Sequence, residues 1–98
     1  MEKLWKFEWD CGRQGYVEGV FIADDKDVEN IIGKQVYFGE ILGKHSEVFG
    51  IISEVDIVEL TDNSDVITVL KESVGMSIGG YNPINYIDDY EYEDEDDI

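Results

Sequence analysis

The chain has 98 residues, which suits one domain with a single core, and 43% of the residues are hydrophobic. Seven basic residues face 24 acidic ones, for a net charge of −17, which argues against direct binding to nucleic acid or an anionic membrane, because both require basic patches. The single cysteine, Cys11, excludes an internal disulfide, and no apolar run of about 18 residues predicts a transmembrane helix.

The first predicted element is an antiparallel hairpin. In residues 4–11 (LWKFEWDC), aromatic side chains alternate with charged ones, as in a half-buried strand with one aromatic and one solvated face. A second strand is expected over residues 16–23 (YVEGVFIA), with a turn at residues 12–15 (GRQG). A short helix is predicted next, because Asp24 and Asp25 are suitable N-cap residues and Gly33 follows the last apolar position.

Residues 36–60 read as a second hairpin around which the fold is organised, with a polar turn at residues 43–46 (GKHS). Apolar side chains occupy both faces of its two arms: Val36, Phe38 and Leu42 against Tyr37 and Ile41, then Val48, Gly50 and Ile52 against Phe49, Ile51 and Val55. Because a strand that is apolar on both faces is usually covered on both, this hairpin is expected at the centre of the sheet. Its second arm is expected to bend near residues 53–56.

The remaining chain predicts a second helix and an acidic tail. A helix-start cluster at residues 61–64 and apolar residues at helical spacing predict a helix from about Asp65 to Ser73. Residues 76–87 are expected to be irregular and held to the domain by Tyr81, Ile84, Tyr86 and Ile87. Eight of the eleven residues from 88 to 98 are acidic, a composition that favours disorder.

Together these elements predict an α+β fold. We expect an antiparallel β-sheet of four or more strands, built from two consecutive hairpins, with two short α-helices and a disordered acidic C-terminal tail. Residues 1–87 would form a single compact α+β domain and residues 88–98 the tail. Residues 1–13 lack the apolar region of a secretory signal, so we expect a cytoplasmic protein, in the host cytoplasm if a virus encodes it.

No motif in the sequence is a catalytic signature. His45 is the only histidine, and a triad with Ser46 and Glu47 cannot be inferred from their adjacency, because neighbours on an extended chain point away from each other. A solvated turn residue is the favoured interpretation of His45, and a small core or rim residue that of Cys11. No Cys/His spacing matches a zinc site and the tail lacks a calcium loop, so neither a metal nor a cofactor is expected.

The acidity supports our first functional hypothesis, although solubility alone would also explain it. We expect a non-enzymatic protein that occupies a basic, nucleic-acid-binding surface of a partner protein, as a mimic of nucleic acid. Its composition resembles that of small acidic inhibitors from phages and mobile elements, which favours an inhibitor of host defence or nucleic-acid machinery. Homo-oligomerisation is not indicated. The candidate partner-binding carboxylates are Glu8, Asp10, Glu18, Asp88, Asp89, Glu91 and Glu93.

Two alternatives from other classes stay open. The chain could be a small-ligand module that holds a nucleotide-like or other anionic molecule at its glycine turns, with Arg13, Lys44 and His45 as the contacting residues. The second alternative is a small enzyme that uses His45 together with nearby carboxylates.

Overall fold

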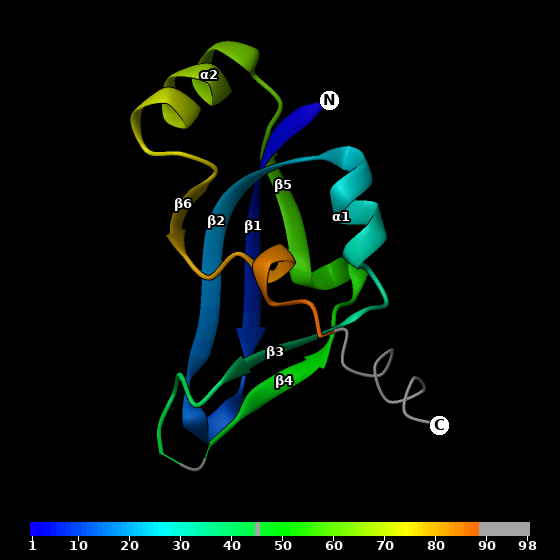
Figure 1. Ribbon diagram of the computed structural model, residues 1–98, viewed down its shortest axis with the longest axis vertical. Helices are drawn as coiled ribbons and strands as arrows, with labels where there is room; N and C mark the ends of the chain where they lie inside the picture. The colour runs from blue at the N-terminus through cyan, green and yellow to red at the C-terminus, as the bar shows by residue number, and fades with distance from the viewer. Residues whose placement is uncertain (45, 89–98) are drawn as a thin grey trace, which may run out of the picture.

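The computed structural model describes residues 1–44 and 46–88 (Figure 1). Its main element is an antiparallel sheet in the order β5-β1-β2-β6, accompanied by a separate two-stranded sheet, β3-β4. The predicted α+β class and four-stranded antiparallel sheet are therefore confirmed. The bounds are β1 (Glu2–Asp10), β2 (Tyr16–Asp24), α1 (Asp25–Ile31), β3 (Gln35–Gly39), β4 (Val48–Ile51), β5 (Ile57–Thr61), α2 (Ser64–Ser73) and β6 (Ser77–Gly80), with 3-10 turns η1 (Gly12–Gln14), η2 (Glu54–Asp56) and η3 (Pro83–Tyr86).

The first hairpin forms as its alternating pattern predicts. β1 and β2 pair over their full length, from Glu2 opposite Asp24 to Asp10 opposite Tyr16. Successive side chains on a strand point to opposite faces, so the aromatic residues of β1 share one face, where Phe7 is fully buried. This face of the sheet is the core face.

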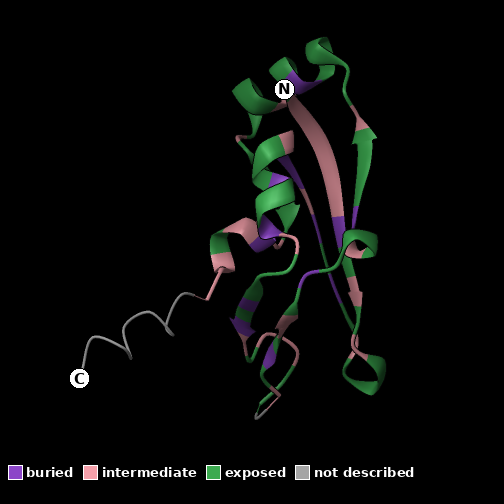
Figure 2. Ribbon diagram, turned by 90° about the vertical axis from the view of Figure 1, so that its right-hand side faces the viewer, coloured by how far each residue is buried: buried purple, intermediate pink, exposed green. Residues whose placement is uncertain are grey.

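The core lies between this face and a layer made by α1, η3 and the β3-β4 sheet (Figures 1 and 2). Its centre is aromatic. The ring of Phe38 lies 5.7 Å from that of Phe7, 5.8 Å from that of Trp9 and 4.8 Å from that of Tyr86, measured between centroids. Such ring pairs add about 0.5–1.5 kcal/mol each beyond the area that they bury.

The expectation that the second hairpin lies at the centre of the sheet is wrong. β3 and β4 form their own small sheet. In the main sheet, β1 lies between β2 and β5. Only the inward face is covered: Val36, Phe38, Val48 and Ile52 are buried, whereas Tyr37, Phe49 and Ile51 are exposed. A short strand with apolar residues on both faces is therefore not always buried on both faces. The local sequence pattern does not distinguish an apolar face that packs on a core from one that is exposed to solvent.

Two further boundaries differ from the sequence expectation. β3 ends at Gly39, so Ile41 and Leu42 belong to the connection to β4 and not to a strand arm. Residues 76–87 contain a strand, β6, that pairs with the edge of β2. The predicted bend near residues 53–56 is confirmed, since η2 lies there between β4 and β5.

After β6 the chain crosses β2 and enters the core layer (Figure 1). The crossing point is Gly19, whose missing side chain makes room for the backbone of Tyr81; a Cβ there would overlap the Tyr81 carbonyl oxygen. The Tyr81 amide donates a hydrogen bond of 3.0 Å to the carbonyl of Glu18. The segment then packs on the core through Tyr81, Ile84, Tyr86 and Ile87, as predicted.

Both helices form where their capping residues predict them. The Asp24 carboxylate accepts a 2.9 Å hydrogen bond from the Lys26 amide at the start of α1, and this bond holds the pKa of Asp24 below its usual value. The ion pair between Lys71 and Glu2 joins α2 to the start of β1. Figure 2 shows α2 largely exposed, and none of the described helices is long and apolar enough to span a membrane.

The predicted disorder of the tail concerns residues 89–98, which lie outside the described residues. Because the apolar residues that pack on the core run to Ile87 and residues 88–97 are acidic apart from two tyrosines, we expect a chain truncated after Asp88 to fold, with a melting temperature within a few degrees of that of the full chain or above it. The cut follows Asp88 because its amide donates a 2.9 Å hydrogen bond to the carbonyl of Gln35.

Thermal unfolding followed by circular dichroism checks this expectation. A chain truncated after Gly75 is the matched control, because it loses β6 and η3 and should be unfolded. An unfolded chain of residues 1–88 would contradict the assignment of the core to these residues.

Candidate partner-binding surface

The face of the sheet opposite the core is open over much of its length. At the α2 end it is covered, since Ile22 on this face is 1% exposed and Ile67 of α2 is 4% exposed. Farther along, the predicted partner-binding residues Glu8, Asp10 and Glu18 are all exposed and lie on this face by strand alternation. We call the part formed by Lys6, Glu8, Asp10, Glu18 and Val20 the open face.

Two of these carboxylates face each other directly. Glu8 and Glu18 are register partners across β1 and β2, an arrangement of like charges that destabilises a sheet. Lys6 offsets it only in part, because its Nζ lies 3.9 Å from Glu18 Oε1, a long ion pair between exposed side chains. Within the described residues, no basic nitrogen lies within ion-pair distance of Glu8.

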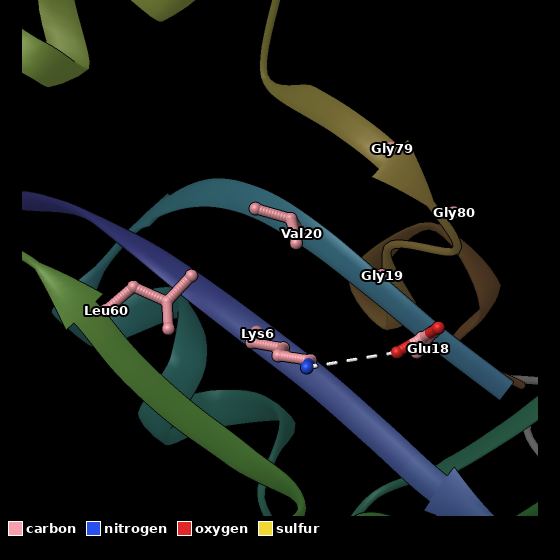
Figure 3. A pocket seen from close by; sticks show the side chains of 7 residues that line it. All are labelled: Lys6, Glu18, Gly19, Val20, Leu60, Gly79 and Gly80. Carbon is pink, nitrogen blue, oxygen red and sulfur yellow. Dashed lines mark ion pairs between the residues drawn. The ribbon is translucent and has the colours of Figure 1, made fainter. Parts of the chain in front are cut away.

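A depression with a volume of about 530 Å³ lies next to this pair (Figure 3). Val20 and Leu60 give it apolar walls, and Glu18 stands at its rim with Lys6. Three glycines complete its lining; these are Gly19, Gly79 and Gly80. Its chemistry suits a long basic side chain, whose methylene groups would contact Val20 and Leu60 while its cationic end pairs with the glutamates.

Sequence reasoning identified the acids of this surface but missed its apolar walls. The position of Val20 on this face can be predicted from the same strand alternation that places Glu18 there. Leu60 could not be placed on this surface from the sequence, because it reaches the face only through the pairing of β5 with β1, whose paired residues are 50 or more positions apart.

Several cations are already paired elsewhere. Lys3 lies 3.1 Å from both Asp25 and Glu59, and its hydrogen bonds to Glu59 and Asp25 raise its pKa. Lys71 lies 2.6 Å from Glu2, and the terminal amine lies 2.9 Å from Asp24. These pairs lie away from Glu8, so they do not neutralise the open face.

Asp88 does not join the open face. It lies beside β3 in the layer on the core side, where its Oδ2 accepts a 3.2 Å hydrogen bond from Gln35 Nε2. The four-stranded sheet therefore separates Asp88 from Glu8 and Glu18. The other tail residues predicted to bind a partner lie outside the described residues; they are Asp89, Glu91 and Glu93.

The two glycine turns proposed for an anionic ligand lie at one end of the molecule. A Cβ built on Gly15 would lie 3.9 Å from Leu42 Cδ2, so the turn that holds Arg13 lies close to the connection that holds Lys44. The amide of Gly12 is bonded to the Asp10 carboxylate at 2.9 Å, which places a negative charge where an anionic ligand would bind. His45 lies outside the described residues, so its role in a ligand site or an enzyme stays a prediction.

The described residues contain no group of three or more His, Cys, Asp or Glu side chains arranged to hold a metal ion. No protein-family model, no curated protein and no solved structure matches this chain.

Proposed function

We propose that this chain is a non-enzymatic acidic binding protein that occupies a basic, nucleic-acid-binding surface of a partner protein. The observation that carries the proposal is the pair of Glu8 and Glu18, held opposite each other on the open face beside a depression with apolar walls. Such a pair costs stability in the free protein. A cationic side chain of the partner would relieve it, which gives the pair a use in binding.

The net charge of −17 supports the same proposal. A groove that normally binds phosphates is lined with lysine and arginine, and carboxylates on a folded surface can compete for it. The composition favours an inhibitor of host defence or nucleic-acid machinery of the kind that phages encode. Complementary charge speeds association at low salt, so the association rate should fall steeply as the Debye length shrinks from about 30 Å at 0.01 M salt to about 8 Å at 0.15 M.

Replacing both Glu8 and Glu18 by glutamine tests the role of the pair. The free energy of unfolding should stay unchanged or rise by about 0.2–1 kcal/mol, because the like-charge pair is removed. Binding to the partner should weaken at the same time, with the association rate reduced. The partner is first isolated by pull-down, and binding and unfolding are then measured on the purified proteins.

The matched control is the double variant Glu29→Gln and Glu72→Gln, which removes the same charge from two exposed helix positions. If it weakens binding as much as the first variant, net charge alone governs the interaction and the open face has no special role. Competition with an oligonucleotide tests the mimicry itself. A complex in which the partner holds the oligonucleotide and this protein together would show that mimicry is wrong.

A further inference from the structure

The outward face of the small β3-β4 sheet carries exposed apolar side chains. Tyr37 and Phe49 are register partners, with ring centroids 6.3 Å apart, and Ile51 pairs with Gln35. The exposed fractions are 43% for Tyr37, 56% for Phe49 and 57% for Ile51. A contiguous apolar surface with polar neighbours is typical of an interaction site, so these three residues define what we call the aromatic face.

Carboxylates border the aromatic face. The Glu47 carboxylate next to the Tyr37 hydroxyl raises the pKa of Tyr37, and partial burial and the charges of Glu40 and Asp88 act in the same direction. Asp88 is held at this edge by its bonds to Gln35. It is also the first residue of the acidic segment 88–98, so that run of carboxylates begins at the border of the aromatic face.

Basic residues are scarce around it. β3 and β4 contain no lysine or arginine, and the nearest ones in the sequence are Lys34, before β3, and Lys44, in the connection to β4. A second copy of this chain would bring the same carboxylates together, and nucleic acid or an anionic membrane would add further negative charge. Charge complementarity therefore selects a positively charged protein segment as the occupant.

We propose that the aromatic face docks a basic segment of the partner protein. Apolar side chains of that segment pack against Phe49 and Ile51, and its lysine or arginine side chains pair with Glu40, Glu47 and Asp88 or stack on the exposed rings. The inference rests on the proposed function in one respect, that the partner is basic. It adds the apolar anchor of the complex, on the other side of the main sheet from Glu8 and Glu18.

The test uses the full chain and synthetic peptides. One peptide alternates arginine with isoleucine and phenylalanine, and the other replaces each apolar residue with serine at the same charge. We expect the first peptide to bind about tenfold more tightly, which is the effect of burying one or two apolar side chains. Equal affinity of the two peptides would overturn the proposal.

Variants assign the binding to the aromatic face. Phe49→Thr and Ile51→Thr should each remove most of the preference for the apolar peptide. Threonine suits a strand, and unchanged circular dichroism would show that each variant is folded. The matched control is Val69→Thr on α2, because Val69 is 61% exposed, belongs to neither the aromatic face nor the open face, and should leave the preference unchanged. An equal loss in the control would place the binding elsewhere and overturn the proposal.

Two further outcomes separate this inference from the proposed function. If the glutamine variant of Glu8 and Glu18 retains the peptide preference while nucleic acid fails to compete for the partner, the aromatic face stands and mimicry is wrong. If nucleic acid competes but Phe49→Thr changes neither peptide nor partner binding, the aromatic face is wrong. Sedimentation that detects a dimer which Phe49→Thr dissociates would also overturn the choice of a basic segment as occupant.

Discussion

Replacing Gly19 by alanine is expected to destabilise the protein by about 3 kcal/mol or more. The new Cβ would overlap the carbonyl oxygen of Tyr81 and lie 2.6 Å from its amide nitrogen. These are backbone atoms that no side-chain rotation can move aside. Either β2 or the crossing chain must shift, which breaks the hydrogen bond from Tyr81 to Glu18 and disturbs the packing of the following segment.

Gly79→Ala provides the control. A Cβ at Gly79 would meet no atom within 4 Å, and its backbone conformation is one that alanine adopts. This variant should therefore leave stability unchanged or raise it by up to about 1 kcal/mol, because alanine has less freedom in the unfolded chain. Denaturant unfolding of both variants measures the difference. Similar stabilities would mean that the chain does not cross β2 at Gly19.

Phe38→Ala is the second large expected effect, at about 3–5 kcal/mol. Phe38 is 6% exposed and its ring contacts those of Phe7, Trp9, Tyr81 and Tyr86. Truncation would leave a cavity where the main sheet, β3 and η3 meet. The loss is a large share of the roughly 5–15 kcal/mol that stabilises a typical domain, so a partly unfolded variant at room temperature is an expected result.

Phe49 on the neighbouring strand β4 allows the same substitution, phenylalanine to alanine, to be made at an exposed position. Phe49→Ala removes a ring that is 56% exposed and should cost less than about 1 kcal/mol, mainly through its cross-strand contact with Tyr37. The two free energies of unfolding decide the orientation of the β3-β4 sheet. A larger loss for Phe49→Ala would mean that the sheet presents the opposite face to the core.

Local patterns predicted the local elements. The alternation of Trp5, Phe7 and Trp9 with charged residues was enough to place β1, and Asp24 was enough to place the start of α1. The same alternation also placed Glu8, Asp10 and Glu18 on solvated positions. That Glu8 lies opposite Glu18, however, depends on the register set by η1, which the residues of the turn do not reveal.

The pairing of segments that are far apart in the chain could not be predicted from the sequence. The sheet order depends on β5 pairing with β1 and β6 pairing with β2, and both contacts join segments far apart in the sequence. The sequence predicts Tyr37, Phe49 and Ile51 to be buried, because strand-forming apolar residues look the same in a core and on an exposed face. Only the three-dimensional arrangement shows that the main sheet and η3 contact one side of this hairpin.

The crossing of β2 at Gly19 also sets an order of events during folding. β1 and β2 are adjacent in sequence, and such hairpins form within about 1–10 μs. Tyr81 and Tyr86 reach Phe38 from a segment that is synthesised some forty residues later. Until that segment arrives, β2 has an unpaired edge and the ring of Phe38 lacks part of its cover, and both features promote aggregation. A nascent chain that stalls before β6 is therefore the species that we expect chaperones to bind.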